Sequence, residues 1–135
     1  KQKLAKMVIS SERIYLTRKD QILKVLGQDD SASESALMRE INAPEKGIYQ
    51  ISLLIKKDGS YRLVETYGSR RELSSTELDK ILGLLSNDKS VATDKDVFAK
   101  QEWVEEKVYV FTPIKNKTDD LVGYFVVGVS RKQDL

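Results

Sequence analysis

Residues 48–68 read IYQISLLIKKDGSYRLVETYG, and this stretch is the clearest local structural signal in the chain. Two runs rich in aliphatic and aromatic residues flank Asp58-Gly59, the dipeptide that best suits a two-residue hairpin turn with positive φ at both central positions. Counting outward from the turn gives one face with the pairs Ile55–Arg62, Leu53–Val64 and Ile51–Thr66. The other face has the pairs Lys56–Tyr61, Leu54–Leu63, Ser52–Glu65 and Gln50–Tyr67. The sequence therefore predicts an antiparallel hairpin with one aliphatic face and one mixed face.

The mixed face of this hairpin has two interpretations. It suits a surface that faces a ligand, and it equally suits a half-exposed sheet face. Arg62 is the exception on the aliphatic face, because an arginine beside Ile55 must extend its head group to water or find a partner.

The segment after the hairpin predicts one helix. Ser74 and Glu77 have the spacing of a capping box, and the helix over 74–86 buries Leu78, Ile81, Leu82 and Leu85. Residues 87–96 are polar and predict a loop, and we expect a short strand within 97–103.

Two strands are predicted at the end of the chain, over 107–114 and 121–130, on either side of a polar turn. The apolar run Tyr124-Phe125-Val126-Val127 indicates a central strand that is covered on both faces.

Two helices are predicted before the hairpin. The first, over 1–26, ends at Gly27 and has an apolar stripe at three- and four-residue steps, formed by Leu4, Met7, Val8, Ile14, Tyr15, Ile22 and Leu26. It suits either a continuation of a membrane span or a plain core helix. The second begins at a cap, Ser31 or Ser33, and runs to about Ile41, with Ala36, Leu37 and Ile41 turned inward.

At 135 residues the chain is expected to form one domain, 1–135, whose sheet occupies 48–130 with the helix 74–86 inserted. Helices packed on an antiparallel sheet of roughly five strands make an α+β fold.

The composition excludes several classes of site. The chain has no His and no Cys, so it lacks the usual ligands of zinc or haem and the bases and thiols of common hydrolases. We therefore predict no catalytic residues, no metal, no cofactor and no enzymatic activity. Its 23 basic and 21 acidic residues alternate along the chain, which argues against a nucleic-acid partner.

The C-terminal strands carry a family resemblance. Residues 109–114 (YVFTPI), a polar turn, and residues 121–130 (LVGYFVVGVS) resemble the closing strands of Cache domains, the PAS-like extracellular sensor modules of prokaryotic receptors. The long opening helix, the hairpin and the capped helix follow in the order of the single-module form. The resemblance implies an extracellular or periplasmic signal-sensing domain of a membrane receptor such as a histidine kinase, chemoreceptor or cyclic-dinucleotide enzyme. Because the chain opens at Lys1 rather than Met, we expect membrane spans to flank it in the full protein.

The same resemblance implies a small ligand, often a carboxylate, on the sheet face opposite the long helix. Carried over by position, the ligand-binding candidates are Tyr61, Arg62, Tyr67, Trp103, Tyr109 and Phe111. Only one face of each strand can line a pocket, so Arg62 and the tyrosines are alternatives, and each aromatic also has a core-packing explanation. A homodimer through the N-terminal helix is a further expectation. The alternative function is a cytoplasmic PAS-like or longin/profilin-like protein-interaction module.

Overall fold

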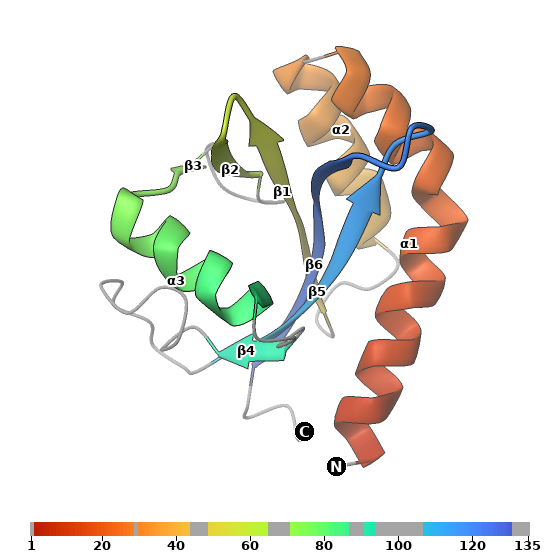
Figure 1. The fold of residues 1–135 in the computed structure, drawn as a ribbon. Helices are drawn as coiled ribbons and strands as arrows, with labels where there is room; N and C mark the ends of the chain where they lie inside the picture. Colours follow the sequence, from red (N-terminus) through yellow and green to blue (C-terminus); the bar gives the residue numbers. More distant parts are fainter. Residues whose placement is uncertain are drawn as a thin grey trace.

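The computed structural model describes residues 2–28, 30–43, 49–64, 71–86, 91–93 and 107–130. The strands form one antiparallel sheet in the order β3-β2-β1-β6-β5-β4. Helices α1 and α2 cover one face of this sheet, and α3 lies on the other (Figure 1). In chain order the described elements are α1 (Gln2–Gln28), α2 (Ser31–Asn42), β1 (Gln50–Lys57), β2 (Ser60–Val64), β3 (Arg71–Glu72), α3 (Ser75–Ser86), β4 (Val91–Thr93), β5 (Lys107–Lys115) and β6 (Leu121–Ser130).

The predicted α+β class, with a long N-terminal helix on an antiparallel sheet, is confirmed. Four strands of five or more residues, β2, β1, β6 and β5, make up the centre of the sheet. The short β3 and β4 flank them. β4 lies inside the stretch predicted as a loop, so that prediction was wrong there: Val91, Ala92 and Thr93 pair with Val110, Tyr109 and Val108. The strand expected within 97–103 lies outside the described residues.

The hairpin prediction is confirmed in both turn and register. Asp58 has φ 52° and Gly59 has φ 80°, the positive values that the Asp-Gly dipeptide was expected to adopt. β1 and β2 pair as counted from the turn, from Lys57 with Ser60 to Leu53 with Val64. The predicted pairs beyond Val64 involve residues outside the described ranges.

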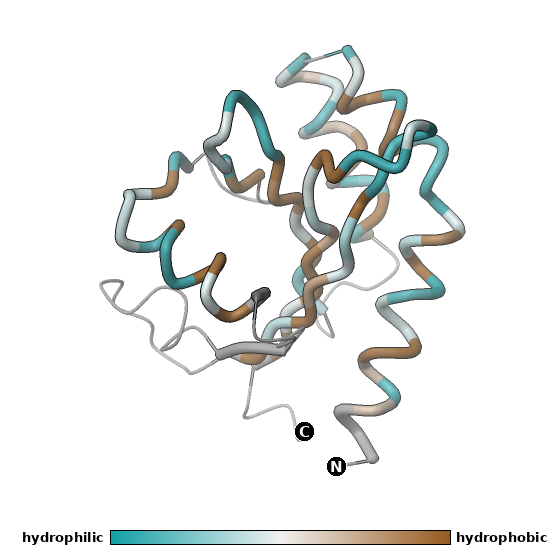
Figure 2. Tube along the Cα trace, viewed as in Figure 1, coloured by the Kyte–Doolittle hydropathy of each residue, from teal (hydrophilic) through white to brown (hydrophobic). Residues whose placement is uncertain are grey.

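The sheet separates two hydrophobic clusters. The first lies between the sheet and α1 and α2, and it includes Met7, Ile22, Leu53 and Phe125, each at most 1% exposed. The second lies between the sheet and α3 and includes Leu54 and Ile81. β6 contributes to both clusters, which confirms the prediction of a central strand covered on both faces. In Figure 2 the strands at the centre of the sheet are brown, whereas the tip of the β1–β2 hairpin is teal.

The helix boundaries differ from prediction in two places. α1 continues through Gly27 to Gln28, because a single glycine weakens a helix without stopping it. The cap of α2 is Asp30 rather than Ser31 or Ser33, and its carboxylate accepts hydrogen bonds from the N–H of Ala32 at 3.0 Å and the hydroxyl of Ser33 at 2.8 Å. Asp30 takes this role because its backbone is extended, as a cap requires, while Ser31 is already helical.

Most of the helix residues that were predicted to face the core are buried, but some are not. Met7, Tyr15, Ile22, Leu37 and Ile41 are buried as expected. Three predicted core residues are instead exposed, because each lies at the edge of its helix's apolar stripe: Val8, Ala36 and Leu82.

The predicted capping box of α3 is confirmed. The N–H of Glu77 donates to the Ser74 hydroxyl at 3.2 Å, and the N–H of Ser74 donates back to the Glu77 carboxylate at 3.4 Å. This reciprocal pair fixes where α3 begins, so the helix meets the sheet at a defined point.

Two glycines of β6 allow close packing at the centre of the sheet. A Cβ at Gly123 would collide with the backbone carbonyl of Leu54, and a Cβ at Gly128 would lie 2.7 Å from the ring of Tyr109. Gly128 pairs with Tyr109 across the β5–β6 ladder, so the ring lies over the glycine. Both glycines belong to the segment that resembles the Cache closing strands, and each has a packing reason.

The beginning of α1 and the end of β6 lie at the same end of the molecule (Figure 1). Among the described residues no helix is both long and apolar enough to cross a membrane.

Candidate functional site

Three of the predicted ligand-binding residues come together on the sheet face that α3 covers. Tyr61, Tyr109 and Phe111 are each at most 5% exposed and belong to one hydrophobic cluster. The rings of Tyr109 and Phe111 lie 6.4 Å apart between centroids. This face is opposite α1, the side on which the Cache resemblance places a ligand.

Tyr124 joins this group and was not among the predicted residues. Its ring centroid lies 6.1 Å from that of Tyr61, and the Tyr61 hydroxyl donates a hydrogen bond to it. The pairing of Tyr124 with Leu54 places it on the α3 side, since Leu54 and Lys56 share that face and Lys56 pairs with Tyr61. Tyr124 could have been predicted by counting the residue pairs between β1 and β6. The sequence, however, does not show which strand lies beside β1.

Burial sets the protonation of the two phenols. Burial raises the pKa of Tyr61 above its ordinary value of 10.0, and the charge and hydrogen bond of Tyr124 raise it further. Burial also raises the pKa of Tyr124, although the hydrogen bond from Tyr61 opposes that rise. Both phenols are therefore neutral near pH 7, so they can donate and accept hydrogen bonds but cannot act as charged groups.

Arg62 lies on the opposite face of the sheet from Tyr61, and its partner is internal. Its guanidinium lies 3.3 and 3.2 Å from the two carboxylate oxygens of Glu34 in α2. The side chain of Arg62 is 10% exposed and that of Glu34 is 1% exposed. The sequence indicated that Arg62 needs a partner, and the structure supplies a carboxylate of the chain itself.

Glu34 was missed because it looks like one more polar residue in a serine-rich segment. The available signal was its helical spacing: Glu34 precedes Leu37, Met38 and Ile41 by three, four and seven residues, so it shares their inward face. Tyr67 and Trp103, the remaining predicted residues, lie outside the described residues.

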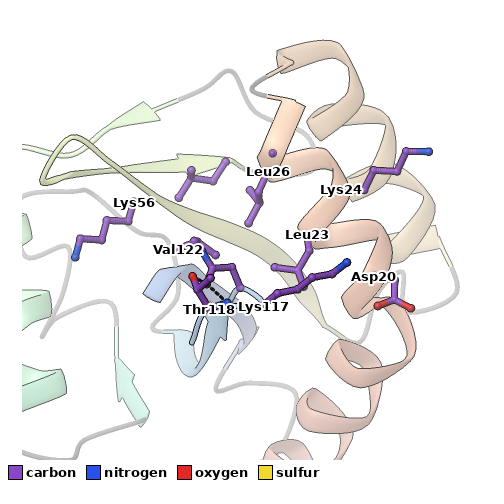
Figure 3. Close-up of a pocket in the computed structure, with 11 residues that line it drawn as sticks. Asp20, Leu23, Lys24, Leu26, Lys56, Lys117, Thr118 and Val122 are labelled. Carbon is purple, nitrogen blue, oxygen red and sulfur yellow. Dashed lines mark hydrogen bonds between the residues drawn. The ribbon is translucent and has the colours of Figure 1, made fainter. Parts of the chain in front are cut away.

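A second candidate site is a groove on the α1 side of the sheet. It has a volume of about 780 Å³ and opens between the C-terminal part of α1, the end of β1 and the β5–β6 turn (Figure 3). Its floor is apolar and consists of Leu23, Leu26, Ile55 and Val122. None of its lining residues was predicted, because the groove joins segments about ninety positions apart in the chain.

Four charged residues also line this groove. Lys24, Lys56 and Lys117 line it together with one carboxylate, that of Asp20. Within the described part of the chain none of the three lysines has an ion-pair partner. Figure 3 shows that the side chains of Lys24 and Lys56 extend in opposite directions, away from the apolar floor. Lys56 pairs with Tyr61, so its side chain belongs to the sheet face that α3 covers.

The turn that forms one wall of the groove is held by its own hydrogen bonds. The Asn116 side-chain oxygen accepts from the N–H of Thr118 at 3.0 Å, the hydroxyl of Thr118 at 2.8 Å and the N–H of Asp120 at 3.0 Å. Asp119 takes a positive φ of 66° to complete the turn. The wall therefore has a fixed shape, with Lys117 at its tip.

The described residues contain no group of three or more His, Cys, Asp or Glu side chains that could hold a metal ion. Their two candidate sites offer buried, hydrogen-bonding phenols and an open groove with an apolar floor. No family model matches the chain, and no curated protein matches it in sequence.

Proposed function

We propose that the chain is an extracytoplasmic signal-sensing domain of a membrane-bound receptor, as its resemblance to Cache domains implies. The observation that carries the proposal is the position of the two ends of the fold. The beginning of α1 and the end of β6 lie at one end of the molecule, as a domain inserted between two membrane spans requires.

The contacts of α1 offer a route by which a signal could leave the sheet. The ring of Tyr15 packs on that of Phe125 in β6 with centroids 5.7 Å apart, and its phenol oxygen has a hydrogen bond from the backbone of Lys115 in β5. Four residues earlier, the hydroxyl of Ser11 lies 3.4 Å from that of Thr112. A ligand that moves β5 against β6 would therefore move α1, whose first turn lies at the end that the proposal assigns to the membrane.

A homodimer through α1 belongs to this proposal. Ile9 and Leu16 are 62% and 58% exposed and lie seven residues apart, so they share one side of the helix. The core-facing side is formed by other residues, Met7, Tyr15 and Ile22. α1 therefore exposes two apolar side chains away from the core, which a partner helix could cover.

The experiment that tests the proposal is a topology measurement on the full-length protein in cells. This chain has no cysteine, and Lys80 on α3 is exposed, so Lys80→Cys introduces a reporter without disturbing the core. We expect a membrane-impermeant maleimide to label this variant on intact cells, with the protein lacking the substitution as the control. Labelling that occurs only after lysis would contradict the proposal and favour the cytoplasmic interaction module.

A further inference from the structure

The side of α1 that faces away from the core carries apolar side chains at seven-residue steps. Ile9 and Leu16 are 62% and 58% exposed. Leu23 lies one step further along and is only partly buried where it lines the groove beside the β5–β6 turn. Because seven residues make almost two full turns of an α-helix, the three side chains form a line along α1. Apolar residues at this spacing are typical of a helix that pairs with another helix.

Charged residues lie on both sides of this line. Glu12 and Arg13 are neighbours in the sequence, so they lie about 100° apart around the helix, one on each side of the line. Lys19 and Asp20 repeat the arrangement seven residues later. Glu12 and Lys19 share one side of the line. Arg13 and Asp20 share the other, so the two sides carry opposite charges at each level. All four residues are exposed, and none has an ion pair within the described part of the chain.

This charge pattern complements itself when two copies of α1 lie side by side and parallel. The two-fold axis of such a pair runs along the helices, so the Glu12 side of one copy faces the Arg13 side of the other. Glu12 then lies opposite the partner's Arg13, and Lys19 lies opposite the partner's Asp20. A shift of one copy by seven residues would instead place Glu12 opposite the partner's Asp20, and these two negative charges repel. Flanking charges of this kind set the register of paired helices.

We propose that α1 forms a parallel, in-register pair with α1 of a second copy of the chain, in which Ile9 and Leu16 each meet the same residue of the partner. The parallel direction rests on the proposed function, because two copies anchored in one membrane have their first turns at the same end. An antiparallel pair would also join opposite charges, but it would place the two first turns at opposite ends. Few apolar side chains are covered, so the pair depends on the high local concentration that a shared membrane gives two anchored copies.

The test is disulfide cross-linking of the full-length protein in its membrane. The chain has no cysteine, so a single introduced cysteine reports on one position of α1, and the protein without the substitution is the control for cysteines elsewhere. Thr17 is exposed but lies off the apolar line. On mild oxidation we expect Ile9→Cys and Leu16→Cys to form dimers about tenfold faster than Thr17→Cys, because a disulfide requires Cα atoms within roughly 7 Å of each other.

The Ile9→Cys variant decides the direction of the pair. In a parallel pair Ile9 meets the partner's Ile9, whereas in an antiparallel pair centred on Leu16 it meets the partner's Leu23. Cross-linking of Ile9→Cys with co-expressed Leu23→Cys but not with itself would overturn the proposal. Equal rates for Ile9→Cys and Thr17→Cys would also overturn it.

Charge reversal tests the pairing of the flanking residues. In the Ile9→Cys protein, Glu12→Lys places a positive charge opposite the partner's Arg13 and should slow cross-linking several-fold. Adding Arg13→Glu restores opposite charges in a parallel pair, so the rate should recover. The matched control is Asp79→Lys, which makes the same change in charge at an exposed position of α3, on the other side of the sheet. Equal slowing by Asp79→Lys, or no recovery in the double variant, would contradict the proposed register.

The cross-linking result and the topology result fail separately. The topology measurement uses a cysteine on α3 and does not depend on how α1 pairs. Labelling of Lys80→Cys on intact cells without cross-linking of Ile9→Cys would overturn the helix pair and leave the receptor role standing. Cross-linking of Ile9→Cys together with labelling only after lysis would overturn the extracytoplasmic role and support the parallel pair.

Discussion

The guanidinium of Arg62 in β2 faces both carboxylate oxygens of Glu34 in α2, at 3.3 and 3.2 Å, across the interface between the helix layer and the sheet. Both side chains are removed from water, and the only other charged group in the buried set of described residues is Glu77, at the cap of α3. The pair joins α2 to the outer part of the sheet. Each charge thus depends on the other for its compensation.

Removing one partner should be far more costly than removing both. Glu34→Gln leaves the Arg62 charge buried without a counter-charge, and we expect it to lower the free energy of unfolding by about 3 kcal/mol. The double variant Glu34→Leu/Arg62→Met should lose much less, because it buries no charge. Urea unfolding measures both. A loss below about 1 kcal/mol in Glu34→Gln would show that water or another group compensates Arg62.

Gly128 should not tolerate a side chain. Gly128→Ala places a methyl group 2.7 Å from the ring of Tyr109, and we expect a loss of about 1–3 kcal/mol in the free energy of unfolding. Gly83→Ala in α3 is the matched control, because its Cβ meets nothing within 4 Å, and it should stabilise by about 0.5–1 kcal/mol. Thermal unfolding compares the two. Equal stability of Gly128→Ala and wild type would mean that the Tyr109 ring can move away at no cost.

Asn42 substitutes for a strand beside β1. Its side-chain oxygen accepts from the N–H of Ile51 at 2.8 Å, and its side-chain nitrogen donates to the carbonyl of Ile51 at 2.9 Å and to that of Met38 at 2.8 Å. Asn42→Ala removes these three buried hydrogen bonds and should cost about 2–3 kcal/mol. Hydrogen exchange provides a local measurement. After correction for the change in global stability, the Ile51 amide should exchange faster in the variant, whereas amides in β5 should keep their protection. Unchanged exchange at Ile51 would contradict this role.

The tyrosine pair predicts a loss of stability at alkaline pH. Burial raises the pKa of Tyr61 in the folded state above 10.0, so the folded protein holds this proton more tightly than the unfolded chain does. The resulting stabilisation is fully present below pH 10 and is lost as the pH rises through the folded-state pKa. In Tyr61→Phe the decline above pH 10 should be shallower than in wild type. Urea unfolding between pH 9 and pH 11 measures it, and parallel curves for the two proteins would refute the assignment.

Local sequence signals determined a substantial part of this fold. Asp58-Gly59 specified the turn and hence the register of β1 with β2, because only a few residue types accept positive φ at both positions. Ser74 and Glu77 specified the start of α3 through bonds three residues apart. The continuous apolar run in β6 specified a strand buried on both faces.

Other features could not be predicted because they join segments distant in the chain. The partner of Arg62 is Glu34, 28 positions away, and its identity depends on how α2 lies across β2. The choice of Asp30 as the cap of α2 depended on backbone angles, since neighbouring serines offer the same chemistry. The groove requires α1 and the β5–β6 turn to meet, and no local pattern encodes that meeting.

Local sequence patterns were therefore enough to predict the helices, the four long strands, the hairpin register and the central place of β6, but not the short strands β3 and β4. The long elements follow from backbone preferences and side-chain periodicity over a few residues. The tertiary structure decided which face each element presents to which neighbour. It placed Arg62 against Glu34 and away from the tyrosines, and it opened a groove between α1 and the β5–β6 turn. Burial and charge pairing depend on how the elements pack against one another. A helix with the same local sequence pattern can pack on either face of a sheet, so local patterns do not show which face it covers.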